Sequence, residues 1–179
     1  MADGGVEEDL DAGVPDSGES LPGGVSTPPP PAPPPGPRDT CRVEVRNTHI
    51  GGSLSWAPIW HLYIVHTDEN GRRTGWRGGP GGGGAPGTYG SIVGTTGRYA
   101  PGFIDWDPDS DSVTVSMGDG VCGKTSCFAT ELRRIDATNT PYNPTGPNSN
   151  TWVRTVLHNC GLREDKPVWV APGFGDPHL

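Results

Sequence analysis

Pro147-Asn148-Ser149-Asn150-Thr151-Trp152-Val153-Arg154-Thr155-Val156-Leu157-His158-Asn159-Cys160-Gly161 is the most informative stretch of this chain. Its pattern predicts a short helix with a signal at each end. Asn148 or Ser149 can cap the free N–H groups of the first turn, and Gly161 can adopt the left-handed conformation that ends a helix. Between these ends, apolar residues recur at helical spacing: Trp152, Val153, Val156, Leu157 and Cys160. The helix is therefore expected to pack through this stripe.

Ser149 precedes Trp152 and Val153 by three and four residues, so its hydroxyl is expected at the top of the buried stripe. It also lies at the positive end of the helix dipole. Such a position suits a nucleophile, and it equally suits an ordinary capping serine, which is the commoner case. The residues alone leave both interpretations open.

Composition divides the chain into an arm at 1–40 and a domain at 41–179. The arm is rich in proline and holds eight of the acidic residues but one basic residue, so it carries most of the formal net charge of −8. With so few apolar residues it is expected to be disordered. The domain is close to neutral and has no basic face, which argues against a nucleic-acid partner. No apolar run reaches the roughly 18 residues of a membrane span, and no export signal is visible. An acidic, proline-rich arm is nevertheless compatible with a secreted or tethered protein.

Four cysteines occur in the domain. Cys122 and Cys127 bracket a Gly-Lys-Thr-Ser turn and are candidates for a local disulfide, which would require an oxidising compartment. The spacing does not match a zinc knuckle, so no metal site is expected. Cys160 is expected to be a small buried hydrophobe. No cofactor is implied, and the sequence does not indicate an oligomeric state.

The rest of the domain predicts an α+β fold, in which a mainly antiparallel sheet packs against two helices. The second helix is expected at 125–138, and 78–90 is expected to be a glycine-rich loop or lid. Alternating or β-prone stretches predict strands at 41–46, 60–66, 73–77, 103–106 and 112–117. In the strand at 60–66, His61, Tyr63 and Val65 share one face, whereas Leu62, Ile64 and His66 share the other.

The order of these motifs resembles the circularly permuted papain-like proteins, which include NlpC/P60-like and lecithin-retinol-acyltransferase-like hydrolases and acyltransferases. A histidine opens a strand as His-x-Tyr-Ile-Val, and Asn148-Ser149-Asn150-Thr151-Trp152 stands where that family begins its nucleophile helix. The resemblance covers roughly 55–161. It implies that His61 is the general base and Ser149 the nucleophile, with a third polar residue, not placed, on a neighbouring strand. It also implies binding contacts from Asn148, Asn150 and Tyr63.

One departure from the family is important, because Ser149 replaces a cysteine and a hydroxyl is far harder to deprotonate than a thiol. Three interpretations follow. The first is a Ser-His hydrolase or transferase of acyl, amide or ester groups, with helix-start N–H groups as the oxyanion hole and a small-molecule, peptide or lipid substrate. The second is an inactive domain that binds a ligand or partner. The third is a structural domain in which Ser149 is a cap and His61 is a histidine whose polar groups are satisfied within the fold.

Overall fold

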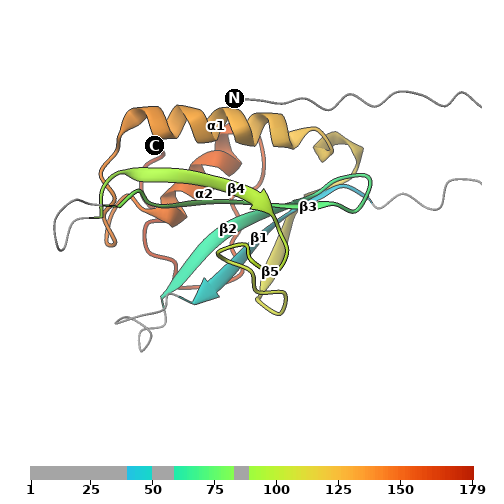
Figure 1. Ribbon diagram of the computed structural model, residues 1–179, viewed down its shortest axis with the longest axis horizontal. Coiled ribbons are helices and arrows are strands. Elements are labelled where there is room, and N and C mark those ends of the chain that lie inside the picture. The colour runs from blue at the N-terminus through green and yellow to red at the C-terminus, as the bar shows by residue number, and fades with distance from the viewer. Residues whose placement is uncertain (1–39, 50–58, 83–88) are drawn as a thin grey trace, which may run out of the picture. The chain divides into compact units, whose positions relative to one another are not determined.

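The computed structural model describes residues 40–49, 59–82 and 89–179, and almost all of the predicted arm at 1–40 lies outside these ranges. The domain is α+β, as predicted. A five-stranded sheet in which every neighbouring pair is antiparallel is covered on one face by two α-helices (Figure 1). Within the described residues, no helix is long and apolar enough to cross a membrane.

The strand order in the sheet is β4-β3-β2-β1-β5. The hairpin turn predicted after the histidine strand joins β2 to β3, and its backbone N–H groups bond the Asp68 side chain. The strands run over the following residues: β1 Arg42–His49, β2 Trp60–Thr67, β3 Arg73–Pro80, β4 Ile92–Arg98 and β5 Ser112–Met117.

Two α-helices follow the strands: α1 Lys124–Thr138 and α2 Ser149–Asn159, preceded by the short 3-10 helix η2 Asp119–Val121. The predicted stripe of α2 is buried, and Gly161 takes the left-handed conformation with φ 66°. The stripe and the inner face of the sheet form one hydrophobic core. Its buried residues include Leu62, Ile64, Trp76, Phe128, Ile135, Trp152, Val156 and Leu157. Burying these side chains is the main force that holds the two layers together.

The outer face of the sheet is covered by the segment between β4 and β5. Tyr63 and Val65 of β2 form a second cluster there with Tyr99, and Phe103 and Trp106 pack against it. The prediction of a strand at 103–106 is therefore wrong. Residues 103–106 instead form part of a loop that packs on the sheet. Apolar alternation does not distinguish the two cases, because strand propensity largely measures fit to a half-buried surface.

The predicted glycine-rich loop at 78–90 starts too early, because β3 extends to Pro80. Gly78 belongs to β3, and β4 was not predicted at all. A Cβ on Gly78 would lie 2.5 Å from the Cβ of Trp152, and one on Gly94 would lie 2.5 Å from Cγ of Leu132. The glycines thus let the helices approach the sheet closely, which explains their presence inside strands. Residues 83–88 of this region lie outside the described ranges.

The cysteines form two disulfides, Cys41–Cys122 and Cys127–Cys160, so the local Cys122–Cys127 pairing is wrong. Cys160 is buried in the core, as expected, but its sulfur is bonded to that of Cys127. The antiparallel β1–β5 pair places the start of β1 beside the turn after β5, and Cys41 and Cys122 have a Cα–Cα distance of 5.1 Å. Cys127 and Cys160 join α1 to α2. Two disulfides of this kind fit an oxidising compartment.

Candidate functional site

The start of α2 is held by Asn148, which is the N-cap. Its Oδ1 accepts hydrogen bonds from the backbone N–H groups of Asn150 and Thr151, and the Thr151 hydroxyl accepts one from the Asn148 backbone N–H. This reciprocal arrangement is a capping box. Ser149 is consequently the first residue of the helix. The capping role that was predicted for Asn148 or Ser149 belongs to Asn148.

Asn150 attaches this helix start to β2. Its Oδ1 accepts a hydrogen bond from the Leu62 backbone N–H at 2.8 Å, and its Nδ2 donates to the Trp60 carbonyl at 3.0 Å. These backbone groups are free because β3 pairs with β2 only from Ile64 onward. The first turn of α2 therefore occupies the place beside β2 that β3 leaves open. Because Trp60 and Leu62 flank His61, the first turn of α2 is bonded to the backbone on both sides of that histidine.

His61 belongs to the outer face of the sheet, together with Tyr63, and is 6% exposed. Ser149 is 2% exposed. Among the described residues, no hydrogen bond joins the two side chains, nor does the Ser149 hydroxyl bond any other described group. The second histidine, His66, points to the inner face and bonds the Val121 carbonyl at 2.8 Å. The prediction that the two histidines face opposite sides is thus confirmed.

Asp105 is the main polar partner of His61. Its Oδ2 lies 3.2 Å from Nε2 of His61 and 2.8 Å from Nε of Arg77, and Asp105 is 6% exposed. A buried carboxylate is costly unless paired, and the guanidinium of Arg77 compensates for its charge. Asp105 comes from the loop over the outer face, whereas the resemblance led us to expect a third residue on a neighbouring strand. The one signal in the sequence was a carboxylate between the apolar Ile104 and Trp106.

The protonation of His61 follows from this pairing. Nε of Arg77 also lies 3.3 Å from Nε2 of His61. The Arg77 N–H therefore has two acceptors within reach, Oδ2 of Asp105 and an unprotonated Nε2 of His61. The ionised Asp105 is a much stronger acceptor than an imidazole nitrogen. We therefore assign the ring proton to Nε2, where it is donated to Asp105, which leaves the Nδ1 lone pair as the basic site.

The three residues expected to bind a ligand have their polar groups occupied within the protein. The amide groups of Asn148 and Asn150 both donate to the Pro172 carbonyl in addition to their bonds at the helix start. The Tyr63 hydroxyl lies 3.0 Å from that of Tyr99, and burial raises the pKa of Tyr63. These side chains hold the elements around the site together.

A pocket of about 610 Å³ opens beside the Asp105 loop. Arg77, which bonds Asp105, forms part of its wall, and the apolar side chains of Phe103 and Ile104 form another part. The side chain of Ile104 is 71% exposed and gives this pocket an apolar wall. The remaining lining comes from the end of β4 and the turn after it: Thr95, Thr96, Gly97, Arg98, Ala100, Pro101 and Gly102.

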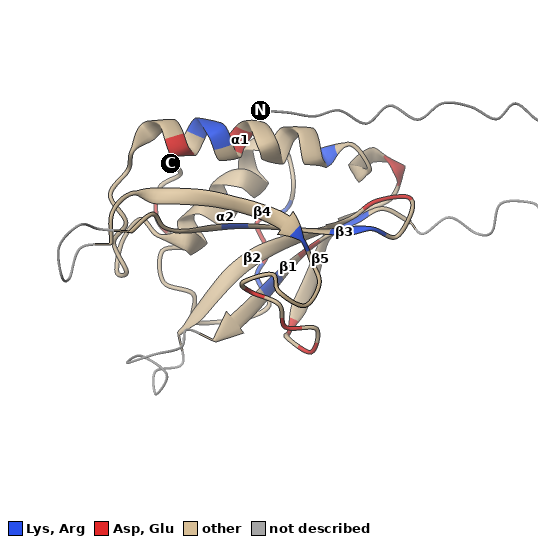
Figure 2. Cartoon of the chain, viewed as in Figure 1, with Lys and Arg blue, Asp and Glu red and all other residues tan. Residues whose placement is uncertain are grey.

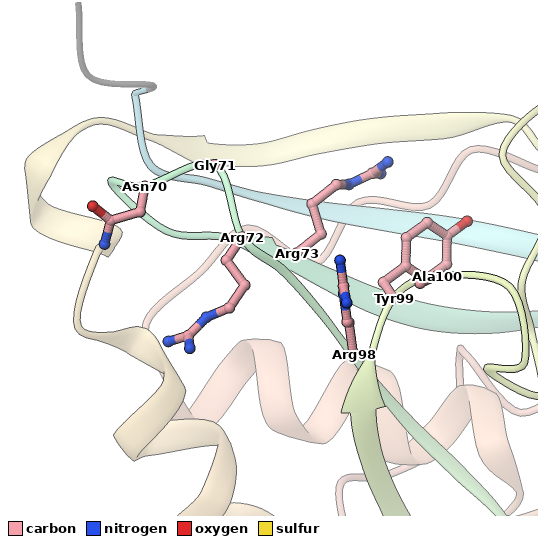
Figure 3. A pocket seen from close by; sticks show the side chains of 7 residues that line it. All are labelled: Asn70, Gly71, Arg72, Arg73, Arg98, Tyr99 and Ala100. Atoms are coloured by element: carbon pink, nitrogen blue, oxygen red, sulfur yellow. The ribbon is translucent and has the colours of Figure 1, made fainter. Parts of the chain in front are cut away.

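A second pocket, of about 400 Å³, lies at the β2–β3 turn and shares Arg98 and Ala100 with the first. Figure 3 shows the side chains of Arg72 and Arg73 pointing to opposite sides, and the side chain of Arg98 rising from the end of β4. Arg72 pairs with Asp68, and Arg73 pairs with Glu44 and covers the Tyr99 ring. Much of the positive charge here is thus compensated within the protein. In the view of Figure 2, acidic and basic residues are likewise interspersed.

Comparison with known proteins finds no match: neither a protein-family model, nor a curated protein, nor a solved structure is similar to this chain. Asp105 is bonded to Nε2 of His61. The side chain of Asn150, the residue after Ser149, is bonded to the backbone on both sides of that histidine.

Proposed function

We propose that the chain is a hydrolase or transferase of acyl, amide or ester groups, in which Ser149 is the nucleophile, His61 the general base and Asp105 the residue that orients His61. One observation carries the proposal. The helix that begins at Ser149 is bonded by its second residue to both backbone neighbours of His61. A nucleophile, a base and an orienting carboxylate are the parts of a catalytic triad, which is recognised by geometry and not by sequence order.

The proposed reaction uses the free lone pair of His61. Nδ1 accepts the hydroxyl proton of Ser149 while Oγ forms a bond to the substrate carbonyl carbon. The imidazolium then gives this proton to the departing alcohol or amine as the scissile bond breaks, and an acyl-serine remains. Water, or another acyl acceptor, releases the acyl group by the same steps. Asp105 stabilises the imidazolium and fixes its tautomer throughout. In unliganded sites the bond between nucleophile and base is often long, so its absence here is compatible with this role.

The backbone N–H of Ser149 is the donor best suited to the oxyanion. Asn148 takes up the N–H groups of Asn150 and Thr151, so these two helix-start donors are not free for a substrate. Among the described residues, the N–H of Ser149 has no acceptor. It also lies at the positive helix end, where a developing negative charge is favoured. The expected oxyanion hole is therefore reduced from several helix-start N–H groups to the N–H of Ser149.

The finer architecture belongs to the same proposal. A helix whose first turn enters the split between two strands, with a histidine on one of them, supports a permuted papain-like arrangement of this α+β domain. The substrate would be a small molecule, peptide or lipid, and the pocket beside Arg77, with the exposed Ile104, offers an apolar wall with one charged group for it.

A second candidate function is an inactive binding or structural module of the same fold. It is favoured by the deep burial of Ser149 and by the absence of a bond between Ser149 and His61 among the described residues. It also agrees with the serine in place of the family's cysteine, since a hydroxyl needs more activation than a thiol. The two candidates differ in whether position 149 is chemically reactive.

The test is the Ser149→Cys variant. All four native cysteines are in disulfides, so its thiol is the one free thiol in the chain and can be alkylated alone. We expect iodoacetamide to modify it faster than the exposed control thiol of Ser112→Cys, because His61 and the helix start favour a thiolate. Adding His61→Ala should remove this advantage.

Activity on an activated ester gives the second measurement. Ser149→Ala, His61→Ala and the double variant should lose similar activity, because nucleophile and base act as a unit. A thiol at 149 that reacts no faster than the control, together with native activity in Ser149→Ala, would reject catalysis at this site. The binding or structural module would then remain.

A further inference from the structure

Two of the five histidines of the chain meet at the far end of α2 from Ser149. His158 is in the last turn of the helix, and His178 lies twenty positions later in the segment that folds back on it. Their rings stack with centroids 4.1 Å apart. Glu164, from the loop after α2, lies against both rings. None of these three residues takes part in the candidate active site.

The ligand-bearing atoms of this cluster converge. Nδ1 of His158 lies 2.8 Å from Oε1 of Glu164, and Nε2 of His178 lies 3.4 Å from Oε2 of the same carboxylate. One atom from each residue can be chosen so that all three lie within 4.8 Å of one another. A tetrahedral zinc ion with bonds of about 2.0–2.1 Å holds its ligand atoms roughly 3.3 Å apart. Small side-chain rotations are therefore enough to bring the three atoms around one ion.

From this geometry we propose that His158, Glu164 and His178 bind a divalent transition-metal ion of the zinc class. Two imidazoles and one carboxylate suit zinc, copper and nickel, whereas calcium and magnesium prefer oxygen ligands alone. Three protein ligands leave at least one position for water. When the ion binds, each ring keeps its proton on the nitrogen that does not ligate the metal.

The surroundings of Glu164 fit a ligand. Arg154 donates to Oε2 through Nε and to the Asp176 carbonyl through Nη1, so it fixes the carboxylate and the returning segment together. Such an outer contact orients a ligating carboxylate and leaves Oε1 for the ion. The positive charge of Arg154 opposes that of a metal, so we expect moderate affinity. The side chains of Glu164 and His158 are 27% and 54% exposed, so an ion can reach them from solvent.

The site would connect three parts of the domain. An ion held by His158, Glu164 and His178 joins the last turn of α2, the loop after it and the segment that returns to α2. Leu179 is bound to the same helix, because its backbone N–H donates to the Thr155 hydroxyl. Metal binding should therefore stabilise the folded state, as a ligand does when it binds the native but not the unfolded chain.

Calorimetric titration of the chelator-treated full chain with ZnCl₂ tests the proposal. We expect one saturable site per chain and a rise in melting temperature with zinc but not with calcium. His178→Ala and Glu164→Gln should each weaken zinc binding by at least about tenfold. His49→Ala is the matched control, because His49 lies at the end of β1 against Trp60, and it should bind zinc as the wild type does.

Cobalt substitution adds a spectroscopic measurement. A Co²⁺ complex with visible absorption bands that disappear in His158→Gln would support imidazole ligation. The side chain of His158 is half exposed, so its replacement should leave the fold intact, which circular dichroism can check. The proposal is wrong if the wild type shows no saturable zinc site, or if folded His178→Ala and Glu164→Gln bind zinc as tightly as the wild type.

Discussion

Nε2 of His61 lies 3.2 Å from Oδ2 of Asp105, although 44 positions separate the two residues in the sequence. His61 is on β2, and Asp105 is in the loop that covers the outer face of the sheet. Because Arg77 of β3 bonds the same oxygen, three segments meet at one buried carboxylate. This relationship gives His61 a defined tautomer, and it makes Asp105 the residue whose role can be tested most directly.

Asp105→Asn should reduce activity on an activated ester by between about 10²- and 10⁴-fold, if the proposed triad operates. An amide cannot stabilise the imidazolium and can hold His61 in the wrong tautomer. The comparison is with Asp109→Asn, an exposed residue of the same loop, which should keep wild-type activity. Equal rates in the two folded variants would show that Asp105 has a structural role alone.

Asn150→Ala should lower the free energy of unfolding by about 3 kcal/mol, measured by urea denaturation. Its side chain makes three hydrogen bonds to buried or partly buried backbone groups of Trp60, Leu62 and Pro172, and each such bond contributes about 1 kcal/mol. Asn70→Ala, in the exposed turn after β2, is the control and should change stability little. A loss at Asn150 no larger than at Asn70 would mean that α2 is not held to β2 in this way.

Peptide mapping without reduction should yield two linked pairs, Cys41–Cys122 and Cys127–Cys160. Trypsin cuts after Lys124, between Cys122 and Cys127, so the alternative pairing of these neighbours gives a different linked peptide. The two disulfides close loops of 81 and 33 residues, and the chain-entropy estimate gives each a stabilisation of about 4 kcal/mol. Reduction should therefore lower the melting temperature strongly. A linked Cys122–Cys127 peptide would contradict the structure.

The contribution of Glu164 to stability should depend on pH. Burial alone raises the pKa of this carboxyl, but hydrogen bonds and charge from Arg154, His158 and His178 outweigh it and hold the pKa below 4.5. A lowered folded-state pKa gives stability that is present above pH 4.5 and is lost as the pH falls through the lowered value. In chelator, the melting temperature of the wild type should exceed that of Glu164→Gln at pH 7, and the difference should close below about pH 4.5. A constant difference down to pH 3 would be inconsistent with this pairing.

Local patterns were enough to predict several elements. The boundaries of α2 follow from Asn148 and Gly161, and its buried stripe follows from helical spacing. Period-two alternation predicted most of β1, β2 and β5, and it placed His61 and His66 on opposite faces. In each case the signal lies within one turn or one strand, where backbone geometry alone relates the residues.

The failures share a different origin. β4 was missed because Gly94 and Gly97 weaken its strand signal, and Gly94 is required by the approach of Leu132 from α1. The residues at 103–106 were predicted as a strand because a packed loop and a half-buried strand use the same apolar alternation. Cys122 and Cys127 were paired by their nearness in sequence, whereas their true partners are brought close by the sheet and by the helix pair.

By itself, the sequence determined the periodic elements, their capped ends and the α+β class, because these depend on interactions between residues a few positions apart. His61 and Ser149 became candidates through the order of motifs that resembles a known family. The tertiary structure alone decided that Asp105 is the partner of His61, that Asn150 attaches α2 to β2, and that His158 and His178 meet at Glu164. These contacts join residues far apart in the chain. They depend on how the helices and loops pack against the two faces of the sheet, which no short pattern specifies.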